Sequence, residues 1–311
     1  GVSGAVARAA AASRGVPPYR WLADGDPGAL PLPMVNVLSG GLHAAGGVAV
    51  QDVMVVPRGA DSYGEAIETA WAVRDATRER IRDRGERPLV ADEGGFAPDL
   101  PTPAAAFDLL AGAVRDAGHR PARGDVAFAV DVAATHFHED GTYRLESLDG
   151  SRSTAGMVDL VAGWAAEWPV VSVEDPLAED DWAGWRALSD RLDGVQVVGD
   201  DLLATSPDRI ARAADAGAAT AVLVKPNQAG TVTRTLDAVE AAREHGLAPV
   251  VSARSGETCD ATIADLAVAL DAGQIKIGSL ARSERLAKYN RLFGIARSVE
   301  GFAAGAPPGV D

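Results

Sequence analysis

The sequence predicts an α/β barrel, a closed ring of eight strands surrounded by helices. Short runs rich in valine and leucine alternate with amphipathic segments from about residue 120 onward, which is typical of a parallel sheet. Two further strands and two helices precede six such strand-helix units, and together they give the eight strands of a closed barrel. Most runs end in a charged residue, and in such barrels the chemistry lies at the carboxyl ends of the strands.

The N-terminal part of the chain supplies the first elements. Residues 1–15 form an alanine-rich helical segment, and residues 16–32, rich in proline and glycine, form a connector. Strands are expected at 34–38 and 48–56, and because they are consecutive and joined by a loop, they could pair antiparallel. Ser62 is a typical N-cap residue and marks the start of the next helix.

The rest of the chain alternates between strands and helices. The apolar runs are short and rich in β-branched residues, whereas the helical segments are longer and repeat apolar residues every three to four positions. The remaining strands are expected at 126–131, 170–174, 195–200, 221–225, 249–254 and 274–276. Helices are expected at 62–84, 102–118, 157–167, 181–192, 208–217, 233–246, 261–273 and 283–301.

The composition excludes several classes of protein. Of the 311 residues, 47% are hydrophobic and 23% are charged, as in a globular protein with a sizeable core. The net charge of −15 argues against nucleic acid or an anionic membrane as the main partner. No apolar run approaches the roughly 18 residues that span a membrane, and the first residues lack the pattern of a secretion signal. A single cysteine, Cys259, excludes an intrachain disulfide, so we expect a cytoplasmic protein.

Charged residues stand at the ends of six successive predicted strands. A charge at the end of an apolar run is costly unless it is paired or binds a metal. A helix cap or a surface salt bridge explains any one of them equally well, but that explanation is strained for six in succession. These residues are Asp131, Glu174, Asp200, Lys225, Arg254 and Lys276.

Three converging carboxylates without a cysteine or histidine beside them suit a hard dication, with Mg²⁺ first. A lysine whose pKa is lowered by burial and neighbouring charge can act as a base near neutral pH. A second lysine can hold the charge that develops on a carboxylate. Together these groups indicate abstraction of a proton α to a carboxylate, with metal and lysine stabilising the enediolate.

Longer motifs extend this pattern over almost the whole chain. They are GGLHAAGG, DEGGFAP, VSVEDPLAEDDW, VGDDL, VKPNQAGT, RSGET, TIADLAVAL, GQIKIG and ARSERLAKYN. In these motifs the chain resembles the enolase (phosphopyruvate hydratase) family. The resemblance implies a TIM-like barrel of the enolase type, with β2α2 followed by six βα units. It also implies that residues 1–30 are a remnant of the enolase N-terminal domain with its linker, and that residues 31–311 form the barrel domain.

The resemblance assigns roles to the metal and base side of the site. Asp131, Glu174 and Asp200 match the three ligands of the enolase Mg²⁺ ion. Lys225 matches the base that takes the C2 proton. Lys276 matches the lysine that, with the metal, stabilises the carboxylate side of the intermediate.

The resemblance also assigns the leaving-group side. Glu93 matches the acid that assists departure of the C3 hydroxyl. Arg254 and Ser255 match phosphate contacts, and His43 and Gln51 match substrate-contacting positions.

The chain departs from the family pattern in three places. Ala253 stands where the family has a histidine, and Asp52 stands where it has a glutamate, one methylene longer. Both changes lie on the leaving-group side. The chain also begins near the end of the family's N-terminal capping domain, which supplies a loop that closes the site and helps to hold a second Mg²⁺.

Three functions therefore remain open. The first is the glycolytic dehydration of 2-phosphoglycerate to phosphoenolpyruvate. The second is a paralogue that dehydrates a related phosphonate or phospho-hydroxy acid in secondary metabolism, with a carboxyphosphonoenolpyruvate-type product. The third is a non-catalytic enolase-like binding protein. The expected partners are a small anionic phosphorylated or phosphonate substrate and a second copy of the chain in a dimer, with no nucleic acid and no membrane.

Overall fold

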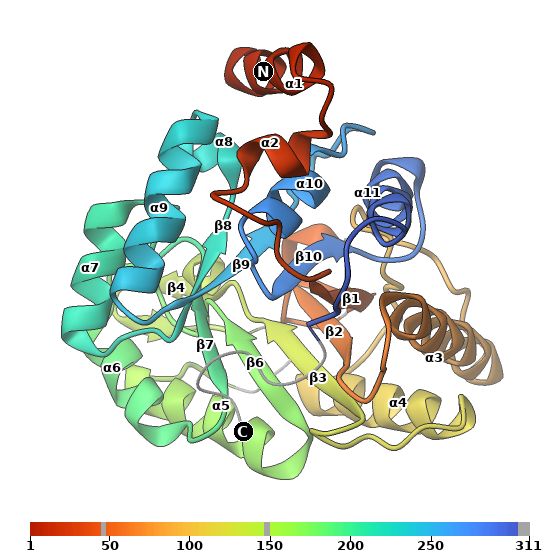
Figure 1. Cartoon of the computed structure of the whole chain (residues 1–311). Coiled ribbons are helices and arrows are strands. Elements are labelled where there is room, and N and C mark those ends of the chain that lie inside the picture. Colours follow the sequence, from red (N-terminus) through yellow and green to blue (C-terminus); the bar gives the residue numbers. More distant parts are fainter. Residues whose placement is uncertain (45–47, 146–149, 304–311) are drawn as a thin grey trace.

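The computed structural model describes residues 1–44, 48–145 and 150–303 and shows a closed barrel ringed by helices (Figure 1). The motif at 40–47 lies partly outside these residues, as does the predicted end of the barrel domain beyond 303. The barrel strands are β1 (Leu32–Ser39), β2 (Asp52–Pro57), β3 (Val126–Asp131), β6 (Val170–Glu174), β7 (Gln196–Gly199), β8 (Ala221–Val224), β9 (Ala248–Ser252) and β10 (Gln274–Gly278).

The strands close into a ring in the order β1-β10-β9-β8-β7-β6-β3-β2. Strand β2 is antiparallel to both of its neighbours, β1 and β3, and all other neighbouring pairs in the barrel are parallel. The predicted fold class is therefore confirmed, and so is the antiparallel pairing of the first two strands.

The helices begin where the sequence offers caps. The hydroxyls of Ser62, Thr102, Ser153 and Thr231 each accept a hydrogen bond from the backbone N–H three residues later, which satisfies a free donor of the first turn. The helices are α1 (Val2–Ser13), α2 (Pro18–Leu22), α3 (Tyr63–Asp83), α4 (Pro103–Asp116), α5 (Thr154–Glu167), α6 (Trp182–Arg191), α7 (Pro207–Ala216), α8 (Pro226–Ala229), α9 (Val232–Glu244), α10 (Thr262–Ala269) and α11 (Ser283–Ile295).

Several boundaries differ from the prediction. Strand β2 begins at Asp52, because the N–H groups of Gly40 and Gly41 bond to carbonyls in 48–51 and fold that stretch into a loop. Helix α2 lies inside the predicted connector, with Pro18 in its first turn, where proline is favoured. Helix α11 ends at Ile295, earlier than expected. The sequence also gave no sign of the small hairpin of β4 (His138–Glu139) and β5 (Thr142–Tyr143).

Apolar side chains fill the barrel interior and the layer between barrel and helices. The interior group comes from alternate strand positions, such as Met34, Ala129 and Leu223. A chain of hydrogen bonds crosses it. Ser172 Oγ donates to Gln196 Oε1 at 3.1 Å, and Gln196 Nε2 donates to Gln274 Oε1 at 2.9 Å. These hydrogen bonds pair Ser172, Gln196 and Gln274 inside the barrel, and only Nε2 of Gln274 has no partner among them.

Helix α1 lies outside the ring of helices, where it contacts α2 and α9 (Figure 1). The predicted division of the chain at residue 30 stays a prediction. Of the helices in the described residues, none is long and apolar enough to cross a membrane.

Candidate active site at the carboxyl ends of the strands

Each barrel strand contributes one polar or charged residue to a layer at the same end of the barrel. Strands place alternate side chains on one face, so a residue two positions from an interior residue also faces the axis. Strand β2 runs antiparallel and therefore contributes its first residue instead of its last. The eight residues are Asn36, Asp52, Asp131, Glu174, Asp200, Lys225, Ser252 and Lys276.

Lys276 lies between two of the predicted metal ligands. Its Nζ is 2.7 Å from Asp131 Oδ2 and 2.7 Å from Glu174 Oε2, and all three side chains are buried. Burial lowers the pKa of Lys276, but the charges of Asp131 and Glu174 outweigh burial and hold this pKa well above its usual value. Lys276 is therefore a fixed positive charge. A pKa raised in this way does not suit Lys276 to the role of a base.

The pKa values of the two carboxylates beside Lys276 are shifted in opposite directions. Burial would raise the pKa of Asp131, but the charge of Lys276 and its hydrogen bond lower it below the usual value. Burial and the charge of Asp131 raise the pKa of Glu174 well above its usual value. Gln51 Nε2 also donates to Asp131 Oδ2, at 3.4 Å, which links a predicted substrate contact to a predicted metal ligand.

Lys225 and Asp200 form the second pair. Lys225 Nζ donates to Asp200 Oδ2, and Gln228 Nε2 donates to Asp200 Oδ1 at 3.0 Å. Thr205 Oγ1 holds both residues that bond to Asp200, because it accepts from Lys225 N at 3.0 Å and donates to Gln228 Oε1 at 2.7 Å. The short helix α8 thus fixes Lys225 at its N-terminus and presents Gln228 to the same carboxylate.

Asp175 holds the turn that carries Asp200, and sequence reasoning missed it. Its two carboxylate oxygens accept the backbone N–H groups of Asp200 and Asp201, both at 2.9 Å. Asp175 itself adopts a left-handed backbone with φ 42°. Burial and the charge of Asp200 raise its pKa well above the usual value. The sequence signal was present in VSVEDP, where a second acidic residue follows directly after Glu174.

The predicted leaving-group residues form a separate cluster. Asp52 is fully buried, and it accepts hydrogen bonds from Asn36 and, at 2.8 Å, from Ser39 Oγ. His43 Nδ1 lies 2.9 Å from the other oxygen of Asp52. Burial lowers the pKa of His43, but its hydrogen bond to Asp52 and the charge of Asp52 raise it overall. Asn36 and Ser39, which hold the Asp52 carboxylate in place, were not among the residues predicted from the sequence.

Glu93 completes this cluster. Its carboxylate, that of Asp52 and a His43 ring nitrogen lie within 4.8 Å of one another. Burial and the charge of Asp52 raise the pKa of Glu93, so its protonated form is favoured. The backbone carbonyl of Glu93 accepts from Ser279 N at 2.8 Å, which ties the DEGG motif to the end of β10.

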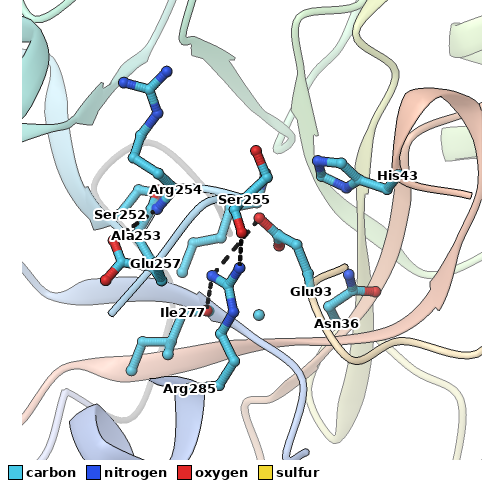
Figure 2. Close-up of polar contacts among 12 residues, drawn as sticks. Asn36, His43, Glu93, Ser252, Ala253, Arg254, Ser255, Glu257, Ile277 and Arg285 are labelled. Carbon is cyan, nitrogen blue, oxygen red and sulfur yellow. Dashed lines mark hydrogen bonds and ion pairs between the residues drawn. The ribbon is translucent and has the colours of Figure 1, made fainter. Parts of the chain in front are cut away.

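Arg254 and Ser255 lie at the rim instead of inside the cluster. Arg254 is half-buried, and its guanidinium donates to Asn227 Oδ1 at 3.1 Å. Figure 2 shows this side chain pointing away from Glu93. Ser255 is exposed, and Ala253 is buried beside it with its N–H bonded to Lys276 O at 2.9 Å.

Comparison with known families agrees with this geometry. The sequence matches the family described as "Enolase, C-terminal TIM barrel domain" over residues 27–305. The chain belongs to the enolase superfamily. The match covers every strand of the barrel and all the predicted site residues, so the charged layer is that of an enolase-type barrel and indicates an enzyme of the lyase type.

Within the enolase barrel, the structure offers more than one arrangement of acidic ligands. Asp131 and Glu174 share Lys276, whereas Asp200 is grouped with Asp175 and Asp201, whose oxygens lie within 4.8 Å of one another. The donor set consists of carboxylates, which suits a hard dication. An ammonium group lies beside each of these carboxylate groups, Lys276 beside Asp131 and Glu174 and Lys225 beside Asp200, and it compensates the charge that such a cation would neutralise.

A cavity of about 560 Å³ opens beside Gln51, between the loop that precedes β2 and the residues that follow β3. His136, His138 and Arg144 lie on its wall. The described part of the cavity wall thus carries imidazole and guanidinium groups next to a predicted substrate contact.

Proposed function

We propose that this protein is a Mg²⁺-dependent hydro-lyase that converts 2-phosphoglycerate to phosphoenolpyruvate. The observation that carries the proposal is the division of the site into two halves. Lysines and carboxylates lie on one side, and a buried carboxyl group with a raised pKa lies on the other. Elimination of water needs both a base for the C2 proton and an acid for the C3 hydroxyl.

Each half has a role in this reaction. Lys225 Nζ takes the proton from C2, and its neighbour Asp200 stabilises the ammonium that forms. The electron pair of the broken C–H bond first delocalises into the substrate carboxylate. It then forms the C2–C3 double bond as the C–O bond at C3 breaks. Glu93 gives its proton to the departing hydroxide, so that water leaves. Burial favours the protonated form that this step requires.

The remaining charges act on the substrate. Asp131, Glu174 and Asp200 would hold Mg²⁺, and the ion would stabilise negative charge that develops on the substrate carboxylate. Lys276 supplies a permanent positive charge for the same group. Arg254 and Ser255, which are solvent-accessible at the rim, would bind the phosphate. A small anionic substrate fits these groups, and a homodimer remains a prediction that sedimentation analysis can test.

Two measurements test the proposal. Purified protein with Mg²⁺ and 2-phosphoglycerate should form phosphoenolpyruvate, and Lys225→Met should abolish this activity. Calorimetric titration with Mg²⁺ should show binding that Asp131→Asn weakens and Asp201→Asn leaves almost unchanged. If Asp201→Asn abolishes Mg²⁺ binding while Asp131→Asn does not, the cation sits on the Asp175–Asp200–Asp201 group and the assigned ligand set is wrong.

A second candidate shifts the substrate to a phosphonate or another phospho-hydroxy acid. Ala253 replaces the family's histidine on the leaving-group side, and the shorter Asp52 accepts hydrogen bonds from Asn36 and Ser39. Both features change the space and the hydrogen bonding around the leaving group. A panel of 2-phosphoglycerate and phosphonate analogues tests this candidate, and a clear preference for 2-phosphoglycerate rejects it. If the wild-type chain neither binds Mg²⁺ nor turns over any of these substrates, a non-catalytic binding protein is favoured instead.

A further inference from the structure

Arg285 is a fully buried residue that joins three parts of the proposed site. It lies in the first turn of α11, in the motif ARSERLAKYN, and none of the assigned roles uses it. Its side chain passes Gly278, where an added Cβ would lie 3.0 Å from Arg285 Cδ and 3.0 Å from the carbonyl oxygen of Glu93. Gly278 also has φ 108°, so glycine is required there on two grounds.

The guanidinium reaches both the proposed acid and the proposed phosphate loop (Figure 2). Its Nη1 donates to Ile277 O at 2.9 Å, and its Nη2 donates to Ser255 O at 2.8 Å. The same Nη1 is 3.8 Å from Glu93 Oε1. The planar guanidinium of Arg285 thus contacts the Glu93 carboxylate and the backbone carbonyls of Ile277 and Ser255.

We propose that Arg285 is the positioning residue of the leaving-group half, which sets the Glu93 carboxyl group relative to the loop that carries Ser255. The proposal rests on the proposed function, because it assumes that Glu93 is the acid. A guanidinium suits this task, since its fixed fork of donors holds several acceptors in one plane. Its charge also faces the carboxylate that remains after Glu93 has given up its proton. Misplacing a catalytic group by about 1 Å can cost a hundredfold in rate.

A second arginine provides a matched control. Arg74 binds the loop that carries Glu93, with Nη2 donating to Gly94 O at 3.2 Å, and its Nε donates to Ser279 Oγ at 3.0 Å. Its guanidinium also lies 4.3 Å from the centre of the Phe96 ring. Within the described residues, Arg74 makes no hydrogen bond or ion pair with the Glu93 carboxylate. Arg74→Met therefore loosens the loop that carries Glu93 without removing a cation that contacts the Glu93 carboxylate.

Two rates separate positioning from general loss of structure. In a stepwise elimination, Lys225 can exchange the C2 proton with deuterated solvent even when the leaving group does not depart. Arg285→Met should lower the rate of phosphoenolpyruvate formation about a hundredfold, while C2 exchange stays within about threefold of wild type. Arg285→Lys should restore part of the elimination rate. Arg74→Met, which leaves the contacts of the Glu93 carboxylate in place, should change the ratio of the two rates far less than Arg285→Met does.

A double-mutant cycle closes the test. If Arg285 acts through Glu93, Arg285→Met should cost less than about threefold in elimination when it is added to an E93Q background. Equal loss of both rates in Arg285→Met, or additive losses in the cycle, would overturn the proposal. If Arg285→Met does not fold, Arg285→Lys in the wild-type and E93Q backgrounds supplies the same comparison.

One outcome distinguishes the two proposals from each other. Wild-type protein that shows neither exchange nor elimination refutes the proposed function. The same cycle is then measured by chemical denaturation, where Arg285→Met and Glu93→Gln must still be non-additive. Additive effects on unfolding would show that the two groups do not interact, and the positioning role would fall with them.

Discussion

Replacing Lys276 by methionine tests whether the lysine ammonium groups hold the charged layer together. Lys276 is 7% exposed and bonds to Asp131 and Glu174, whose side chains are 4% and 3% exposed. Removing the ammonium leaves two buried carboxylates without their shared partner. Breaking a buried ion pair in this way costs about 3–5 kcal/mol of unfolding free energy. For 311 residues, at ~2.1 cal/mol/K of unfolding entropy per residue, that loss lowers the melting temperature by about 5–8 °C.

Scanning calorimetry in a chelator and in excess Mg²⁺ measures this effect. In the chelator, Lys276→Met should melt below the wild type by the amount given above. Mg²⁺ should then raise the melting temperature of the variant more than that of the wild type, because a dication would replace the missing positive charge. Lys225→Met is the matched control. Within the described residues it forms an ion pair with Asp200 alone, which is 13% exposed, so a smaller loss is expected. An unchanged melting temperature for Lys276→Met in the chelator would refute the reasoning.

Three further predictions concern the leaving-group side and the support of Lys225. The charge of Asp52 helps to raise the pKa of Glu93, so Asp52→Asn should lower that pKa and move the alkaline limb of the kcat profile to lower pH; a shift to higher pH would contradict the assigned acid. Ala253→His should raise the rate on 2-phosphoglycerate about tenfold or more, because a positioned acid-base group contributes at least that much. The folded variant is assayed on 2-phosphoglycerate and on a phosphonate panel, and an unchanged rate on 2-phosphoglycerate would favour the second candidate. Thr205→Val should lower the free energy of unfolding by about 1–3 kcal/mol in denaturant titrations, because its buried partners lose a hydrogen bond. Ser206→Ala removes no side-chain cap bond and should be nearly neutral. Equal effects of the two substitutions would show that the Thr205 hydrogen bonds contribute little to stability.

Local sequence was sufficient for the ring of strands. The β-branched runs at 126–131 and 221–225 have only one reasonable length and period, and both strands formed within one residue of these limits. Prediction failed where backbone hydrogen bonds compete with the strand ladder. Residues 48–51 are apolar enough for a strand, but their carbonyls bond to Gly40 and Gly41 instead.

The candidate site was only partly readable from the sequence. A charge at a strand end is a local signal, and it identified residues such as Asp131 and Lys276. The signal is weaker for the supporting residues. Asp175 shows only as a second acidic residue after Glu174, and Thr205 looks like an ordinary turn residue until its partners are known. Their importance lies in backbone groups on other elements, which they bond in the folded chain.

The sequence by itself determined the class of fold and which side chains meet at one end of the barrel. It did so because strand alternation is a local property, and parallel strands bring their carboxyl ends to one edge. Only the tertiary structure decided which charges pair. The ion pair between Lys276 and Asp131 joins residues 145 positions apart, and Arg285 reaches Glu93 through the space left by Gly278. Pairing depends on distances of a few ångströms between strands and helices, which closure of the barrel fixes and a linear pattern does not contain.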